Sequence, residues 1–395
     1  MDGEEDAPTM DLPTPDHCGD GVLEPGELCL ESRPTDLPMR TLHVGDLDAD
    51  GLDDLATFAP DGSSYIGTLW KSDGAGGFVS MAEITLNDTA LAGMHPQLAN
   101  IDGDAHVDVV AAEIALDGGQ VRSYPNDGQW GVLEPIEVEL VGAGEPWNSV
   151  TPVDLNSDGL DDLLVEPYVG SGTLHVVEND GGGEFRATMI TAPSADDCWH
   201  TSTVALPAYS GFTGGVVFVP GECSGAETSA LSLVLAKQGG DVISSKVSTS
   251  GSSPRAAAAG DFDGDDSLEL IVWDSELELF EVFRADFAGG LDPLETLSLE
   301  ELCPTCERGG EPSTKVLLDA GDFDGEPATD LMLSFGSSVH FGLNPLTDES
   351  GWTAWSTFDG PVFQQVVLDL DGDDVDDAIL VDSSTQTAVA LLNRF

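Results

Sequence analysis

Basic residues are scarce in this chain. Only 12 Lys and Arg stand against 74 Asp and Glu, which gives 395 residues a formal net charge of −62. A surface of this sign repels nucleic acid and anionic lipid and keeps a protein in solution. Salt would screen the repulsion, so the composition also suits a salty environment. We therefore expect no nucleic-acid partner and a largely solvating role for the acidic surface.

Long apolar runs and helical patterns are missing as well. No run of 18 or more apolar residues occurs, so no membrane span is predicted, and no cleavable signal sequence is recognisable. The chain has 46 Gly, 23 Pro and many short β-prone segments, with no sustained amphipathic helix. These features predict an all-β fold.

The groupings typical of catalysis are also absent. The seven His are scattered along the chain, and none sits in a nucleophile elbow or a zinc-binding helix. No phosphate loop or dinucleotide fingerprint is found. We therefore expect a protein that is not an enzyme.

Six short acidic segments, in contrast, recur along the chain. Each has oxygen-bearing side chains at positions one, three, five and nine of a nine-residue loop. Alternate residues of a tight loop point to one side, so the first three can converge, and the carboxylate at position nine can close the cage. Position seven would contribute its backbone carbonyl, which leaves its side chain free to vary. The predicted metal residues, in loop order, are Asp46, Asp48, Asp50, Leu52 and Asp54; Asn100, Asp102, Asp104, His106 and Asp108; Asp154, Asn156, Asp158, Leu160 and Asp162; Asp261, Asp263, Asp265, Ser267 and Glu269; Asp322, Asp324, Glu326, Ala328 and Asp330; Asp369, Asp371, Asp373, Val375 and Asp377.

This oxygen-only chemistry favours calcium, which takes six to eight oxygens at about 2.3–2.6 Å in irregular geometry. Magnesium demands near-octahedral geometry and is the weaker candidate. An EF-hand would need Glu at position twelve and flanking helices, whereas apolar, β-prone residues occupy that position here. A solvated turn is an alternative for any single loop. Six copies favour about six Ca²⁺ ions, with the Glu326-Pro327 loop departing most from the pattern.

The spacing of the loops predicts the architecture. From Asp46 to Asn100 and from Asn100 to Asp154 the interval is 54 residues, and from Asp154 to Asp261 it is 107, nearly two periods. The skipped repeat, around residues 204–219, keeps a strand-turn-strand pattern without acids. Four short strands per repeat predict a seven-bladed β-propeller with a metal-free fourth blade. The expected blades cover residues 38–90, 91–143, 144–196, 197–250, 251–301, 312–358 and 360–395.

A closed ring needs one more strand than this last segment supplies. Residues 388–395 read as the third strand of the seventh blade, and propellers remove exposed edges by closure. The fourth strand should then come from the N-terminal side, with Glu27–Glu31 as the candidate.

The six loops and three Gly-rich turns (residues 72–78, 126–130 and 179–185) resemble the FG-GAP/VCBS repeat family, which includes the heads of integrin α-subunits and many bacterial surface proteins. The resemblance covers residues 38–395 and implies calcium loops between the first and second strands of each blade. Some calcium propellers of this kind are polysaccharide lyases, but 12 Lys and Arg leave little basic material for that chemistry.

Six Cys fall into three local pairs, Cys18/Cys29, Cys198/Cys223 and Cys303/Cys306. An even count in close pairs predicts disulfides in an oxidising compartment. A redox Cys-x-x-Cys motif and a four-Cys zinc site are the alternatives. The second pair brackets the metal-free blade, so we expect a crosslink to stand in for the missing ion.

The N-terminus is expected to be a tether. Residues 1–17 are acidic and Pro-rich, which predicts disorder, and residues 18–37 form a Cys-rich segment with the ring-closing strand. The motif at Cys18–Cys29 resembles one found in secreted bacterial proteins and lipoproteins. By this resemblance, a signal or lipid-bearing segment would precede it. The expected location is extracellular or on the cell surface.

A binding scaffold is the leading functional hypothesis. We expect a monomer that docks an unidentified protein or glycan partner at the cell surface. A lectin that stacks sugars on Trp147, Trp199, Trp352 or Trp355 is the alternative, against packing of the same rings between blades.

Overall fold

The computed structural model describes residues 28–35, 37, 41–61, 64–87, 95–104, 106–113, 120–138, 147–167, 174–181, 185–190, 198–209, 212–223, 230–237, 241–251, 253–286, 289–303, 306, 316–347, 351–356, 361–373, 375–382 and 388–393. The expected tether at 1–17 and most of the Cys-rich segment, including Cys18, lie outside these residues.

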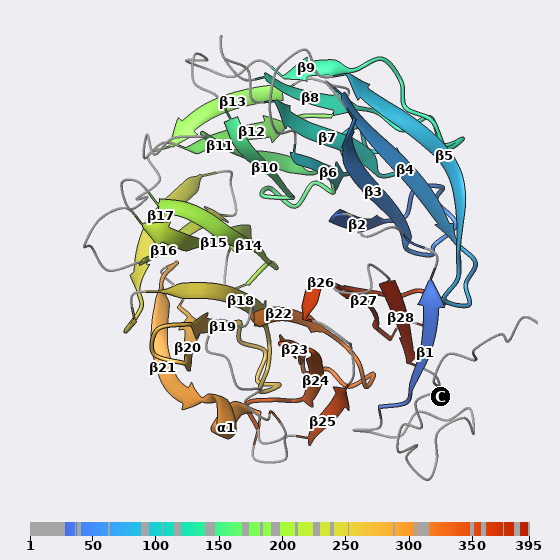
Figure 1. Cartoon of the computed structure of the whole chain (residues 1–395). Coiled ribbons are helices and arrows are strands. Elements are labelled where there is room, and N and C mark those ends of the chain that lie inside the picture. The colour runs from blue at the N-terminus through green and yellow to red at the C-terminus, as the bar shows by residue number, and fades with distance from the viewer. Residues whose placement is uncertain are drawn as a thin grey trace, which may run out of the picture.

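Seven four-stranded antiparallel sheets form a closed ring, with the first strand of each blade nearest the centre (Figure 1). The predicted all-β, seven-bladed propeller is confirmed. The strands of blades one to four are β2 Thr41–Gly45, β3 Asp54–Asp61, β4 Ser64–Ser72 and β5 Phe78–Asn87; β6 His95–Ala99, β7 Asp108–Glu113, β8 Gln120–Tyr124 and β9 Ile136–Val138; β10 Trp147–Val153, β11 Asp162–Pro167, β12 Leu174–Asn179 and β13 Phe185–Ile190; β14 Cys198–Leu206, β15 Phe212–Cys223, β16 Ala230–Lys237 and β17 Val242–Ser248.

Blades five and six have the same plan, and one short helix follows blade five. Its capping box joins Ser298 and Glu301. The elements are β18 Pro254–Gly260, β19 Glu269–Asp274, β20 Leu279–Ala285, β21 Leu291–Ser298 and α1 Leu299–Leu302; β22 Val316–Gly321, β23 Asp330–Phe335, β24 Ser338–Leu343 and β25 Gly351–Ser356. No helix in the described part of the chain is long and apolar enough to cross a membrane.

Blade seven is completed from the other end of the chain. It consists of β26 Val362–Leu368, β27 Asp377–Asp382, β28 Ala388–Asn393 and, at its outer edge, β1 Leu30–Thr35. Strand β1 pairs antiparallel with β28, from Leu30 opposite Asn393 to Thr35 opposite Ala388. The strand therefore overlaps the expected segment 27–31 at residues 30 and 31 and extends further along the chain.

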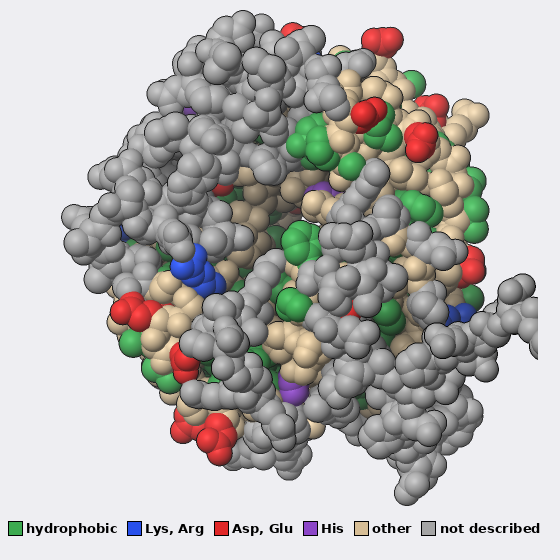
Figure 2. All heavy atoms as spheres, in the orientation of Figure 1, with side chains coloured by type: hydrophobic (Ala, Val, Ile, Leu, Met, Phe, Trp, Pro, Cys, Tyr) green, Lys and Arg blue, Asp and Glu red, His purple; other side chains and the backbone are tan. Residues whose placement is uncertain are grey.

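The hydrophobic core is divided among the blade interfaces. Each of seven buried clusters joins two adjacent sheets; between blades seven and one, for example, Leu370 and Leu392 pack against Leu42 and Leu55. On the face seen in Figure 2, a few hydrophobic side chains lie beside the central hollow, and acidic side chains lie mostly toward the rim. Sheet-to-sheet packing thus holds each blade to its neighbours, and the loops at one end of the sheets are free to carry function.

Candidate metal loops and the contacts that link them

All six acidic loops lie between the first and second strands of their blades. In blade one the loop runs from the end of β2 at Gly45 to the start of β3 at Asp54. The residue at position four has a positive φ in every loop: Ala49, Gly103, Ser157, Gly264, Gly325 and Gly372. The left-handed turn therefore does not need glycine, since Ala49 and Ser157 adopt it as well.

Carboxylates converge inside these loops. In four of them, three acidic groups each offer an oxygen within 4.8 Å of the others. In the first and fourth loops these are positions one, three and five. In the fifth and sixth loops they are positions one, three and nine, Asp322, Asp324 and Asp330 or Asp369, Asp371 and Asp377. Convergent carboxylate oxygens are the ligands that a hard divalent cation prefers.

Asparagine enters the other two loops at one position each, Asn100 and Asn156. Asn100 accepts the backbone N–H of Gly103 through Oδ1 at 3.2 Å and donates through its amide to the carbonyl of Gly159 in the next blade at 2.6 Å. In the third loop Asn156 Oδ1 accepts the N–H of Asp158 at 2.8 Å. Both amide oxygens thus face their own loops, as a neutral oxygen ligand would.

Glu326, the residue that departs most from the repeat, does not join its cluster. The converging oxygens of that loop come from Asp322, Asp324 and Asp330, and the Glu326 backbone N–H donates to Asp324 Oδ1 at 3.0 Å. His106, at position seven of the second loop, has its ring against Gly128 and its Nδ1 3.2 Å from Asp104 Oδ1. The carbonyl role expected at position seven stays a prediction.

The carboxylate at position nine holds the loop together as well as facing it. In five blades its two carboxylate oxygens accept different backbone N–H groups. One accepts from position two of the same loop, and the other accepts from a residue at the end of the blade's third strand or just past it. In blade seven, Asp377 accepts from Leu370 at 2.9 Å and from Asn393 at 2.6 Å. The residue is fully buried in all six loops. Sequence reasoning assigned it only a ligand role.

Burial raises the pKa of these carboxyls, to about 6 for Asp54 and Asp108 and to about 7 for Asp162, Asp330 and Asp377. Nearby acids raise the pKa further and the backbone N–H donors lower it, but removal of the carboxylate from water is the largest cause. A buried anion without a counter-ion is unfavourable, and a bound cation would relieve this cost.

A pH series in chelator should reveal these carboxyls. Because their pKa values are raised in the folded protein, that state binds more protons than the unfolded chain between about pH 4 and 7. We expect the melting temperature in EDTA to rise as the pH falls from 8 to 5, and the rise to shrink in calcium, which needs ionised ligands. Differential scanning calorimetry at fixed ionic strength measures this. A melting temperature in EDTA that is constant or falls toward pH 5 would contradict it.

Contacts between blades tie neighbouring loops into a chain. Position eight of one loop accepts the backbone N–H of position one in the preceding blade: Asp161 from Asn100 at 2.7 Å, Asp376 from Asp322 at 2.7 Å and Asp53 from Asp369 at 3.3 Å. Thr329 does the same for Asp261 at 3.1 Å. A change at one acidic loop would therefore reach the next one directly.

A second set of contacts comes from the end of the third strand. Asn126 donates to the carbonyl of Leu47, and Asn179 to that of Ile101, at 2.7 and 2.6 Å. Asn393 donates to Phe323 in the same manner, and Ser72 Oγ donates to Leu370 at 3.1 Å. The sequence contained this Asn-Asp-Gly signal, but it read as a turn and gave no indication of a partner in another blade.

The Gly-rich turns share one hydrogen-bonding pattern. Asp73 donates its N–H to the carbonyl of Gly77 at 3.0 Å, and Gly77 donates to Asp73 Oδ1 at 2.9 Å. Asp286 and Gly290 repeat both bonds in blade five at 3.0 and 2.7 Å. This further turn escaped sequence reasoning because Ala285 replaces the usual Asn or Ser before the aspartate.

Blade four has hydrophobic packing where its neighbours have acids. Tyr209 and Phe212 lie at its β14–β15 connection, with ring centroids 5.3 Å apart. Leu268, at position eight of the next blade's loop, is 5% exposed and packs in the same cluster. Position eight is also apolar in blade two, where Val107 donates its backbone N–H to the carbonyl of Asp46.

A disulfide between Cys198 and Cys223 was expected to replace the missing ion of blade four, but the two cysteines lie too far from the position of that ion. Cys198 and Cys223 are directly opposite in register, but at the far ends of β14 and β15 from the 207–211 connection. Strands of this length separate their ends by more than 20 Å, at about 3.3 Å per residue. The pairing itself stays a prediction, because these side chains lie outside the described residues.

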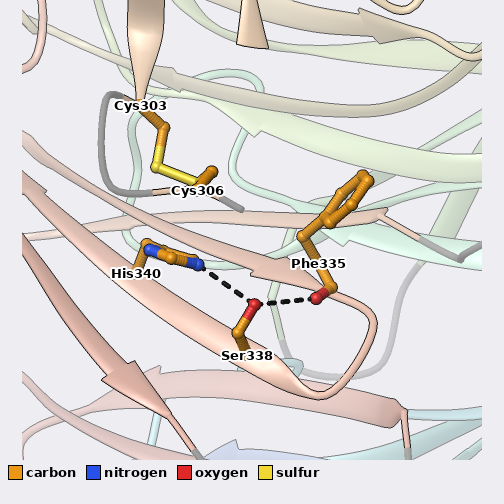
Figure 3. The surroundings of a disulfide bond; sticks show 5 residues. All are labelled: Cys303, Cys306, Phe335, Ser338 and His340. Atoms are coloured by element: carbon orange, nitrogen blue, oxygen red, sulfur yellow. Dashed lines mark hydrogen bonds between the residues drawn. A yellow bond between two sulfur atoms is a disulfide. The ribbon is translucent and has the colours of Figure 1, made fainter. Parts of the chain in front are cut away.

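The sulfurs of Cys303 and Cys306 are bonded, and Cys29 is also disulfide-bonded. His340 lies beside the Cys303–Cys306 bridge, with its Nε2 3.0 Å from Ser338 Oγ (Figure 3). The Ser338 hydroxyl also donates to the carbonyl of Phe335, at 2.9 Å. Burial lowers the pKa of His340 to about 4. A histidine with so low a pKa is a weak base.

Trp352 is partly buried against the protein core. Its ring lies over Gly342 of the neighbouring strand, where an added Cβ would meet it at 2.5 Å, and it contacts the buried cluster between blades five and six. This favours the packing role for Trp352. The side chains of Trp147, Trp199 and Trp355 lie outside the described residues.

Comparison with known proteins supports the repeat. The family model for the FG-GAP repeat matches residues 40–79, and that for the FG-GAP-like repeat matches residues 100–165. A search of the curated proteins gave no match.

Two solved structures are similar at low identity. One is a protein from Lactobacillus plantarum, with 14% identity, a TM-score of 0.47, and coverage of 87% of this chain and 89% of the other. The other is a periplasmic gluconolactonase from Pseudomonas aeruginosa, PpgL, with 15% identity, a TM-score of 0.35, and coverage of 65% and 85%. Neither likeness carries an argument about function.

Proposed function

From a seven-bladed β-propeller that carries FG-GAP repeats, we propose a non-enzymatic, calcium-binding scaffold, located outside the cell, on which a protein or glycan partner docks. The observation that carries the proposal is the convergence of carboxylate oxygens in the loops, together with the hydrogen bonds that join each loop to the next blade. Calcium would supply the positive charge that these buried acids need. The ions would then stabilise the blades and take no part in a reaction.

The non-enzymatic part rests on the chemistry of the described residues. Most of the acids that converge also accept backbone N–H bonds within their loops, so the fold holds them in place. Burial lowers the pKa of His340, beside Ser338, to about 4, which makes this histidine a weak base. A scaffold role needs neither group to react.

Removal of calcium tests the proposal. We expect EDTA to lower the melting temperature of the full chain and millimolar CaCl₂ to restore it, because binding to the folded state alone stabilises that state. With dissociation constants of about 10⁻⁴–10⁻³ M, each occupied site contributes about 0.4–1.4 kcal/mol at 1 mM calcium. Magnesium at the same concentration is the control and should restore less. Identical melting curves in EDTA and in calcium would refute calcium binding.

A further inference from the structure

Two of the six acidic loops already contain a cation that the protein itself supplies. In blade one, Lys71 Nζ contacts Asp48 and lies 2.5 Å from Asp50 Oδ2. In blade five, Arg284 lies 2.5 Å from Asp263, 3.1 Å from Asp265 and 2.9 Å from Glu269. These are two of only 12 basic residues in the chain, and each contacts positions that were predicted to bind metal.

The two residues occupy equivalent places. Lys71 is the penultimate residue of β4, and Arg284 is the penultimate residue of β20, the third strands of their blades. In blade five the register places Arg284 directly opposite Glu269, the ninth loop residue. The corresponding residues in blades two, three, six and seven are Pro125, Glu178, Leu343 and Leu392. None of these can place a positive charge in its loop.

The geometry of the acids differs between the two groups of loops. In the loops of blades one and five, which hold the basic side chains, the carboxylates at positions one, three and five converge. In the loops of blades six and seven, the carboxylates at positions one, three and nine converge instead. Blade five also has Glu at position nine, whose longer side chain reaches the Arg284 Nε. In blade one, the Lys71 ammonium lies 5.7 Å from the Trp130 ring centroid, a further contact that retains it.

We propose that Lys71 and Arg284 are built-in counter-ions that close the loops of blades one and five, so that calcium binds only in blades two, three, six and seven. A divalent ion would have to displace a cation already bound by two or three carboxylates. The inference rests on the proposed calcium binding for the remaining four loops. It divides the ring into metal-dependent and metal-independent junctions.

Calcium stoichiometry of the full chain tests this inference. Equilibrium dialysis followed by elemental analysis should give at most four ions per wild-type chain. Lys71→Met and Arg284→Met should each bind one ion more, and the double variant two more. Arg186→Met is the matched control, because Arg186 is 76% exposed and lies outside the loops; it should bind as the wild type does. Equal, non-zero stoichiometry in all the proteins overturns the inference alone, whereas a wild type that binds no calcium overturns the proposed function.

Stability of the variants gives an independent reading. In EDTA the Lys71→Met and Arg284→Met variants should have lower melting temperatures than the wild type, because each leaves a group of acids without a counter-ion. Calcium should raise the melting temperature of these variants more than it raises that of Arg186→Met. A variant that is unfolded in EDTA should refold on addition of calcium. If it stays unfolded at saturating calcium, or melts as the wild type does in EDTA, the built-in counter-ion is refuted.

Discussion

Phe212→Ala should unfold with a loss of about 3–5 kcal/mol, and the loss should be the same in calcium and in EDTA. Phe212 is 5% exposed in the cluster that joins blades four and five. It contacts Tyr209, and its ring lies close enough to Gly289 that a Cβ there would meet it at 2.6 Å. Truncation of a buried phenylalanine leaves a cavity that the surroundings fill only in part, which typically costs about this much.

The stability loss of Phe212→Ala should not depend on calcium, because the junction of blades four and five is held by apolar packing. At several junctions that follow an acidic loop, position eight of the next blade accepts a backbone N–H of that loop, as Asp161 and Asp376 do. At this junction the partner is Leu268. Urea denaturation in both buffers measures the loss, with Met81→Ala, at a side chain 44% exposed, as the control. A loss that calcium largely reverses would show that this junction depends on metal after all.

Much of the fold follows from one property of the sequence, its period. The 54-residue interval between Asp46, Asn100 and Asp154 specifies the blade length. The doubled interval after Asp154 indicates a blade without acids. Closure follows from the physics of exposed strand edges, which require a partner for Ala388–Asn393. Local pattern and a general rule about edges are therefore sufficient for the architecture.

Contacts across the ring are beyond such reasoning. Lys71 lies 23 residues from Asp48, and Asp53 lies 316 residues from Asp369. Nothing local distinguishes Lys71 or Arg284 from any other basic residue on a strand. The loop residues were predicted as a set from their spacing, but the basic side chains that contact two of the loops come from another strand. That information exists only in the folded sheet.

A ring-closing strand was correctly predicted, but β1 lies further along the chain than the expected segment 27–31. The reason is again a contact between residues far apart in the sequence. Its pairing depends on Asn393, whose Oδ1 accepts the N–H of Cys29 at 3.0 Å. The register is thus determined at the last described residue of the chain and not by the pattern around residues 27–31. The sequence around Arg33 and Pro34 has no strong strand signal of its own.

Asn393→Leu should open the ring closure and cost about 3–5 kcal/mol. The side chain is fully buried and joins three elements: it accepts from Cys29 beside β1, it donates to the carbonyl of Phe323 in blade six, and its own N–H donates to Asp377. Leucine keeps only the backbone bond. Two buried groups then lose their partners, at about 1–3 kcal/mol each, before any strain from the branched side chain is counted.

Ser72→Ala is the matched control, because Ser72 occupies the equivalent position in blade one. Its side chain makes one such contact between blades, to Leu370, so about 1 kcal/mol is expected. Hydrogen exchange should localise the difference. In Asn393→Leu the amides of β1 and β28 should lose protection together while blade three keeps its own, since an unclosed ring exposes the edge of β28. Loss of protection spread evenly over all seven blades, or a cost no larger than that of Ser72→Ala, would mean that closure depends on the interblade core and not on this asparagine.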